Sequence, residues 1–128
     1  MILPNLFIAP TESKGLGVFT SETIVANTTI EVAPVIVMSK EDRVNLDKTL
    51  LHDYIFEWGE DKSKCCMALG YVPIYNHDCP SNCEYEMDYE NRLIQIKTVR
   101  DIEPGEELCI NYNGNFNDDS ALWFQLAK

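Results

Sequence analysis

Residues 75–83 read Tyr-Asn-His-Asp-Cys-Pro-Ser-Asn-Cys, and an apolar run at 67–74 leads directly into them. Buried amides and imidazoles are costly unless they are paired, so this dense polar cluster indicates that something specific meets these side chains. Two asparagines flank a histidine and a proline, which favours an irregular turn that aims amides and backbone groups at a ligand. The alternative is a capped turn whose histidine is hydrogen-bonded within the protein. This stretch alone does not decide between the ligand site and the capped turn.

Two further stretches contain residues that could complete such a ligand site. Residues 14–19 read Lys-Gly-Leu-Gly-Val-Phe, and residues 105–112 read Gly-Glu-Glu-Leu-Cys-Ile-Asn-Tyr. Gly15 and Gly17 allow a positive φ and a close approach of the backbone to a ligand. A plain hairpin turn is the alternative for this first stretch.

Together, and in this order, the three stretches resemble the SET-domain family of protein lysine methyltransferases. They match the family's G-x-G, N-H-S-C-x-P-N and G-E-E-L-x-x-D-Y motifs, and the resemblance covers residues 6–114, with connecting segments most like those of the minimal viral SET proteins. It implies a mainly β fold of several short curved sheets with a threaded pseudoknot at the segment around Tyr112. A SET domain at residues 1–114 would precede a short tail at 115–128, which is predicted to form a short C-terminal helix and a possible lid.

The resemblance implies methyl transfer from S-adenosylmethionine to the side-chain amine of lysine in a protein substrate, for which a histone-like protein is a candidate. In the family the glycine loop wraps the methionine part of the cofactor, and the central Asn-His pair also holds it. The predicted cofactor-binding residues are Lys14, Gly15, Leu16, Gly17, Asn76, His77, Tyr112 and Trp123. Trp123 is alternatively a residue that docks the tail on the core or on a second subunit.

By the same resemblance, Tyr112 is the predicted catalytic residue, and Tyr54, Tyr85 and Tyr112 form the predicted lysine channel. A lysine amine with a pKa of about 10.4 must lose its proton before it can attack a methyl group. Burial among aromatic rings and the positive sulfonium of the cofactor both disfavour the ammonium, so no strong general base is required. The alternative for Tyr54 and Tyr85 is that their rings pack in the core.

Three positions depart from the family pattern. Asp78 replaces the usual serine, Pro80 precedes the variable position instead of following it, and Asn111 stands where aspartate is common. These changes leave the predicted cofactor ligands intact but put the internal hydrogen bonds of the loop in doubt.

Other classes of function are less well supported. A metal-binding module could use His77, Cys79 and Cys83, but the spacing lacks a paired C-x-x-C and a convincing fourth ligand, so no metal is predicted. A thiol hydrolase is disfavoured because neighbours in sequence rarely form a catalytic pair. The main alternative is a catalytically inactive SET fold that binds peptides.

Composition limits the choice further. The 128 residues suffice for one domain, and the net charge of −11 disfavours direct nucleic acid binding and favours a basic protein or peptide partner. Five cysteines without a secretory leader, and no run long enough to span a membrane, predict a soluble intracellular protein with no membrane partner. The expected compartment is the cytoplasm, or the nucleus if the target is chromatin, and a homodimer is possible.

The periodicity of the chain predicts many short strands and few helices. Strands are expected at 6–9, 29–32, 35–38, 54–58, 65–69 and 108–112, with an edge or bend at Pro34 and a hairpin formed by 83–88 and 93–99. Ser39 followed by Asp42 resembles an N-cap before a short helix, and a second capped helix is expected to begin at Asp118.

Overall fold

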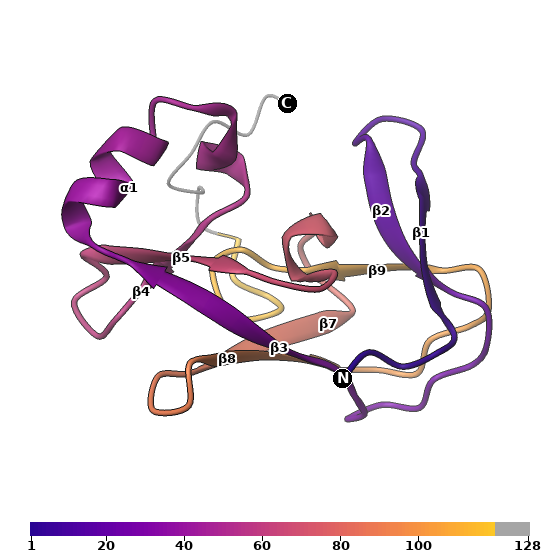
Figure 1. The fold of residues 1–128 in the computed structure, drawn as a ribbon. Coiled ribbons are helices and arrows are strands. Elements are labelled where there is room, and N and C mark those ends of the chain that lie inside the picture. The colour runs from indigo at the N-terminus through magenta and orange to yellow at the C-terminus, as the bar shows by residue number, and fades with distance from the viewer. Residues whose placement is uncertain (120–128) are drawn as a thin grey trace.

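The structure, a computed structural model, describes residues 1–119 and folds them mainly into β-strands (Figure 1). A four-stranded sheet has the order β1-β2-β9-β6, and a five-stranded sheet has the order β4-β5-β3-β8-β7. The first sheet consists of β1 (Leu6–Pro10), β2 (Leu16–Thr20), β6 (Asn76–His77) and β9 (Glu107–Ile110). The second consists of β3 (Thr29–Met38), β4 (Phe56–Trp58), β5 (Lys64–Ala68), β7 (Cys83–Asp88) and β8 (Leu93–Thr98). The predicted mainly β fold of short sheets is confirmed.

The long strand β3 lies in the middle of the second sheet and changes its partner at Pro34. Its first half pairs with β8 as far as Pro34 and Leu93, and its second half pairs with β5 from Val35 and Ala68 onward. Proline has no N–H to donate to a ladder, so it is tolerated where a strand leaves one neighbour for another. The bend expected at Pro34 is therefore a change of partner within one continuous strand.

The helix α1 (Lys40–Leu46) follows β3 and begins as predicted. Ser39 is its N-cap, and the Ser39 hydroxyl accepts a hydrogen bond from the Asp42 N–H at 3.1 Å while the Asp42 carboxylate accepts one from the Ser39 N–H at 3.4 Å. This reciprocal capping box satisfies two N–H groups that the first turn of a helix leaves without partners.

The strand expected at 54–58 begins only at Phe56. A 3-10 helix, η1 (Leu50–Asp53), precedes it, and the N–H groups of Tyr54 and Ile55 still donate to the Leu51 carbonyl at 2.9 and 3.2 Å. These local bonds continue the helical turn past the point where the aromatic run predicted a strand.

The predicted hairpin is formed by β7 and β8, which pair from Cys83 and Thr98 to Asp88 and Leu93. The Asp88 carboxylate holds the turn by accepting hydrogen bonds from both the backbone and the side-chain N–H groups of Asn91. Local turn chemistry and alternation were sufficient to predict this element.

A second 3-10 helix, η2 (Val72–Ile74), delivers the chain to β6, which pairs in parallel with β9. Asn76 is opposite Cys109 and His77 is opposite Ile110, so the central polar stretch lies beside the C-terminal motif. The strand expected at 108–112 ends at Ile110. The N–H of Tyr112 instead donates to the His77 ring. The threading of this segment, expected from the family resemblance, stays a prediction.

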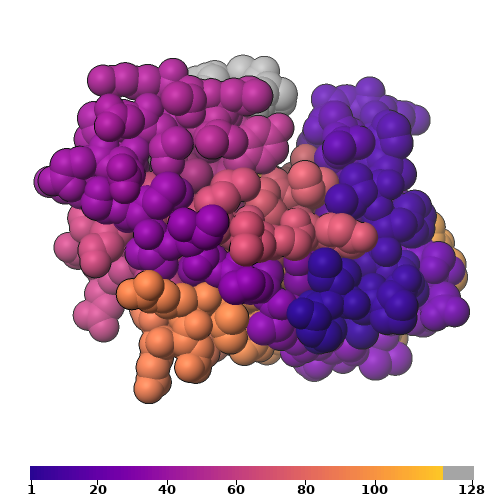
Figure 2. All heavy atoms as spheres, viewed as in Figure 1, coloured from indigo at the N-terminus to yellow at the C-terminus, as the bar shows by residue number. Residues whose placement is uncertain are grey.

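The segment between β5 and β6 lies at the centre of the face shown in Figures 1 and 2. The hairpin of β1 and β2 stands on one side of it, in indigo, and α1 stands on the other side, in purple and magenta. The core beneath is aliphatic, and its fully buried members include Ile30, Ile94, Ile96, Ile102, Leu108 and Ile110. Tyr75, the first residue of the central stretch, is itself part of this core.

The first residues of the predicted tail lie against the central stretch. The Ser81 N–H donates to the Phe116 carbonyl at 2.8 Å, and the Asn111 side chain donates to the Asp118 carbonyl at 2.7 Å. The predicted helix beyond Asp118, with Trp123, lies outside the described residues. The domain boundary at residue 114 stays a prediction.

Candidate active site

The glycine motif forms a hairpin turn whose end lies beside the central stretch. The Thr11 N–H donates to the Gly15 carbonyl at 2.7 Å, and Gly15 has a φ of +73°, which favours glycine. At Gly17 a side chain would collide with the carboxylate of Glu107 on β9. The hairpin turn and the cofactor loop were alternatives for this motif; the structure shows a hairpin, and the role of a cofactor loop stays a prediction.

Asn76 links this hairpin to β9. Its side-chain NH₂ donates to the Leu16 carbonyl at 3.0 Å and to the Glu107 carboxylate at 2.7 Å. A carboxamide has two N–H groups, and both are used here, so its remaining hydrogen-bonding capacity is the Oδ1 acceptor. The Oδ1 of Asn76 can therefore accept a hydrogen bond from a ligand, for example from an ammonium group.

Lys14 and His77 are joined by a hydrogen bond next to Asn76. The Lys14 ammonium donates to the His77 carbonyl at 2.8 Å, and the Tyr112 N–H donates to His77 Nδ1 at 3.1 Å. Burial, together with the nearby Lys14 charge, lowers the pKa of His77, so the ring is neutral with its proton on Nε2. The His77 carbonyl thus binds Lys14, and the His77 ring joins the central stretch to Tyr112.

Tyr112 has its hydroxyl held by backbone. The hydroxyl donates to the Tyr75 carbonyl at 2.7 Å, and the Tyr112 carbonyl accepts from the Tyr85 hydroxyl at 3.0 Å. Burial raises the pKa of Tyr112 well above its usual range and raises that of Tyr85 to about 12. Both hydroxyls are therefore protonated at neutral pH and act as neutral hydrogen-bonding groups, not as bases.

A cavity of about 520 Å³ contains all three tyrosines of the predicted lysine channel. Its lining residues are Asp53, Tyr54, Ile55, Phe56, Glu57, Lys62, Pro73, Tyr85, Glu86, Met87, Tyr89, Tyr112, Asn113 and Gly114. Phe56 stands edge-on to Tyr85 and Tyr112, with ring centroids 5.4 and 6.4 Å away. Three carboxylates and one ammonium on aromatic walls suit a long cationic side chain, because aromatic faces and carboxylates both attract cations.

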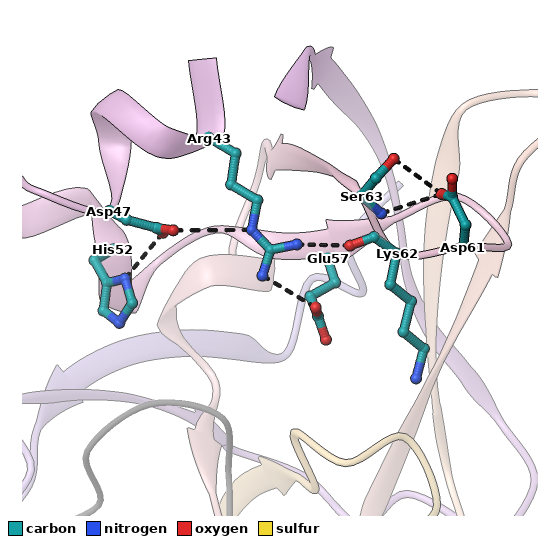
Figure 3. Close-up of polar contacts among 7 residues, drawn as sticks. All are labelled: Arg43, Asp47, His52, Glu57, Asp61, Lys62 and Ser63. Carbon is teal, nitrogen blue, oxygen red and sulfur yellow. Dashed lines mark hydrogen bonds and ion pairs between the residues drawn. The ribbon is translucent and has the colours of Figure 1, made fainter. Parts of the chain in front are cut away.

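Arg43 of α1 braces one wall of this cavity (Figure 3). Its guanidinium donates to the Glu57 carboxylate at 3.0 Å and to the Lys62 carbonyl at 2.6 Å, and it lies 3.9 Å from the Asp47 carboxylate. Asp47 in turn contacts the His52 ring at 3.0 Å. Because Glu57 and Lys62 both line the cavity, Arg43 fixes the position of this wall.

Two site residues were missed by sequence reasoning. The Asn82 amide donates to the Glu107 carbonyl and accepts from the Cys109 N–H, each at 2.8 Å, which pins the central stretch to β9. The Glu107 carboxylate accepts a hydrogen bond from Asn76 and lies where a side chain at position 17 would otherwise be placed. The second asparagine of the central motif was an available signal for Asn82, whereas Glu107 was not distinguished from its neighbour Glu106 in the C-terminal motif.

Asp78 and Asn111, two of the residues that depart from the family pattern, form hydrogen bonds with nearby groups. The Asp78 carboxylate accepts from the Cys79 N–H at 2.8 Å, and the Cys79 thiol donates to the Asp118 carbonyl at 3.4 Å. Asn111 is buried, and its NH₂ donates to that same carbonyl while its Oδ1 accepts from the Asn113 N–H. An ionised aspartate at 111 could not donate to a carbonyl, so the amide suits this chain.

Residues 1–119 contain neither a cluster of metal ligands nor a helix able to span a membrane. Within this range no group of three or more histidine, cysteine, aspartate or glutamate side chains is placed to hold a metal ion. No helix of the same range has the length and hydropathy needed to cross a membrane.

The hairpin, the central stretch beside β9 and the tyrosine-lined cavity together define a SET domain. Residues 15–113 match the SET domain family, and the chain belongs to that family. Curated lysine methyltransferases match this chain over most of its length. The chain is therefore a protein-lysine N-methyltransferase.

Several known proteins are similar to this chain over most of its length. An H3 lysine-37-specific histone-lysine N-methyltransferase of Schizosaccharomyces pombe is 40% identical over 126 residues, which cover 98% of this chain and 80% of that protein. A protein-lysine N-trimethyltransferase of Homo sapiens is 31% identical over 109 residues, covering 80% of this chain and 24% of that protein. A solved structure of a candidate histone methyltransferase from Plasmodium falciparum has a TM-score of 0.63 and 26% identity, covering 87% of this chain and 95% of that one.

Proposed function

We propose that this chain transfers a methyl group from S-adenosylmethionine to a lysine side chain of a basic, histone-like protein, with Tyr112 as the catalytic residue. The main observation behind this proposal is one cavity that is lined by Tyr54, Tyr85 and Tyr112 together with carboxylates. Two similar proteins named for histone H3 lysines support the choice of substrate. The net charge of −11 favours a basic partner and disfavours direct nucleic acid binding.

The residues around the glycine hairpin suit the amino-acid end of S-adenosylmethionine. Lys14 has further N–H groups to offer a carboxylate, Asn76 offers an acceptor to an ammonium, and a side chain added at Gly15 would meet no atom within 4 Å. Leu16 and Gly17, which follow in the hairpin, and His77 and Tyr112, which follow the Asn76 contact, are proposed to complete the contacts with the cofactor. Trp123 is proposed to complete the cofactor site.

S-adenosylmethionine supplies the methyl group on a positively charged sulfonium. The chain's own part is to strip water from the substrate amine, to disfavour its ammonium form and to align it. Tyr85, Phe56 and Tyr112 surround the amine with aromatic surface, which disfavours the ammonium by desolvation. The Tyr112 hydroxyl, held by its 2.7 Å hydrogen bond to the Tyr75 carbonyl, provides an oxygen atom for weak C–H···O contacts that orient the methyl group.

Histone H3 and radiolabelled S-adenosylmethionine test the proposal directly. Label is expected on histone H3 and not on an acidic protein of similar size. Absence of label from every histone and from a cell lysate would contradict the proposed function, and peptide binding without transfer would favour the inactive peptide-binding module.

Replacement of Asn76 by alanine is expected to weaken binding of S-adenosylhomocysteine by about tenfold or more, because a hydrogen bond to a charged group is lost. Calorimetric titration measures this change. Asn5→Ala is the matched control, since it deletes an amide that donates to Thr20, at the other end of β2 from Gly15 and Leu16. Equal affinity of wild type and a folded Asn76→Ala variant would remove Asn76 from the cofactor site.

Replacement of Tyr85 by phenylalanine is expected to raise the number of methyl groups added, with little loss of the first transfer. The Tyr85 hydroxyl donates to the Tyr112 carbonyl, so its lone pairs can accept from the substrate amine or hold a water that restrains a methylated amine. Mass spectrometry of a methylated histone H3 peptide gives the product distribution. Tyr89→Phe is the control, because Tyr89 lines the cavity but its hydroxyl faces Gly59. An unchanged distribution in Tyr85→Phe would make Tyr54 the next candidate.

A further inference from the structure

Glu31 is a carboxylate in an unusual place. It lies on β3 with no exposed surface, and the register of β3 against β8 shifts between Thr29 and Glu31. Burial raises its pKa, whereas hydrogen bonds from the Tyr71 N–H and the Tyr75 hydroxyl act in the opposite direction. A buried carboxylate is costly unless several donors satisfy it, so the identity of those donors shows what it holds.

All the hydrogen-bond donors that face Glu31 in the described part of the chain come from one short segment. Its Oε2 accepts from the Tyr71 N–H at 2.8 Å, and its Oε1 accepts from the Tyr75 hydroxyl at 2.9 Å. The Val72 N–H also stabilises the charged form. Tyr71 is the N-cap of η2 but provides no side-chain cap, so the carboxylate from β3 caps this helix in its place.

The same segment holds the hydroxyl of Tyr112. Tyr75 is fully buried, its ring reaches Glu31, and its backbone carbonyl accepts from the Tyr112 hydroxyl at 2.7 Å. Two hydrogen bonds through one residue therefore connect the buried carboxylate to the tyrosine in the cavity. A carboxylate is suited to this place because it only accepts hydrogen bonds and has two oxygens, one for each end of the segment.

We propose that Glu31 is a positioning residue for methyl transfer, which holds Tyr75 so that the Tyr75 carbonyl fixes the direction of the Tyr112 hydroxyl. The proposal rests on the catalytic role proposed for Tyr112. Glu31 and Tyr75 do not line the cavity, so their side chains act through the carbonyl and not on the substrate.

Two variants test this role. Glu31→Gln keeps the shape but turns one acceptor oxygen into a donor, and Tyr75→Phe removes the hydroxyl while leaving the backbone carbonyl in place. Each is expected to lower kcat roughly tenfold, because small misplacements of a reacting group cost that much or more. KM for histone H3 and the affinity for S-adenosylhomocysteine should not change. The double variant should lose no more than one single variant, since both variants disturb the same series of hydrogen bonds from Glu31 to Tyr75.

Thr20→Val is the matched control for lost stability. Thr20 is buried as completely as Glu31, and its hydroxyl bonds to Asn5 and Glu22 instead of the central stretch. All rates are compared at temperatures equally far below each variant's Tm. An equal fall of kcat in Thr20→Val would mean that general loosening explains the effect, and the proposal would be overturned.

The Tyr112→Phe background separates this proposal from the proposed function. If Glu31 acts through the Tyr112 hydroxyl, Glu31→Gln should not lower the residual rate of Tyr112→Phe any further. Full activity of Tyr112→Phe would refute the proposed catalytic role. A nearly inactive Tyr112→Phe together with full kcat in Tyr75→Phe would refute only the positioning role, and Tyr75→Phe keeps the test decisive should Glu31→Gln fail to fold.

Discussion

Replacement of Tyr112 by phenylalanine is expected to reduce methyl transfer by about 100-fold or more, because a preorganised hydroxyl at the reacting centre is lost. The hydroxyl forms a 2.7 Å hydrogen bond to the Tyr75 carbonyl, which phenylalanine cannot form. The ring itself keeps its contacts with Phe56 and His77, at centroid distances of 6.4 and 5.2 Å, so the cavity is retained. Initial rates with labelled S-adenosylmethionine and histone H3 measure the loss.

The affinity of this variant for S-adenosylhomocysteine and its Tm are expected to stay close to wild type. Tyr89→Phe, another cavity tyrosine, should retain the wild-type rate and so shows that the loss is specific to Tyr112. A Tyr112→Phe variant as fast as wild type would show that the hydroxyl takes no part in the reaction.

Replacement of Gly70 by alanine is expected to lower the free energy of unfolding by about 2 to 4 kcal/mol, through left-handed backbone strain and a steric clash. Gly70 has a φ of +69°, and a side chain there would collide with the buried carboxylate of Glu31. Glu31 cannot move aside freely, because it is hydrogen-bonded to Tyr71 and Tyr75. Urea unfolding with an unchanged m-value measures the loss.

Gly105→Ala separates the two causes. Gly105 has a φ of +86°, but an added side chain there would meet no atom within 4 Å, so this variant reports backbone strain alone. It is expected to lose about 1 to 2 kcal/mol. If Gly70→Ala lost no more than Gly105→Ala, the clash with Glu31 would make no contribution.

Local rules predicted most of the elements. The capping box of Ser39 and Asp42 and the hairpin of β7 and β8 depend on residues a few positions apart, and both occur as expected. The strand assigned to Tyr54 was wrong at its start, because backbone bonds to Leu51 extend the helical turn. Boundaries of this kind depend on competing local bonds that residue types alone do not rank.

The candidate site was less accessible to sequence. The motifs named Tyr112, Asn76 and Tyr85 only through the family resemblance, and those roles stay predictions. Glu107 gave no separate signal, because its carboxylate contacts Asn76 and lies against Gly17. These residues belong to three segments that are far apart in the sequence. Glu31 was not singled out in the sequence; neighbours in a regular strand point to opposite faces, but Ile30 and Glu31 are both buried at the point where the register of β3 shifts.

The sequence by itself determined a single, acidic, mainly β chain with three ordered motifs, because composition, alternation and turn residues act over short distances along the chain. The tertiary structure alone decided that β6 pairs in parallel with β9, and that Tyr54, Tyr85 and Tyr112 line one cavity. It also decided that Glu31 is joined to the Tyr112 hydroxyl through Tyr75. These contacts connect residues 27 to 58 positions apart, and such pairings are selected by the packing of the whole core, which no local pattern encodes.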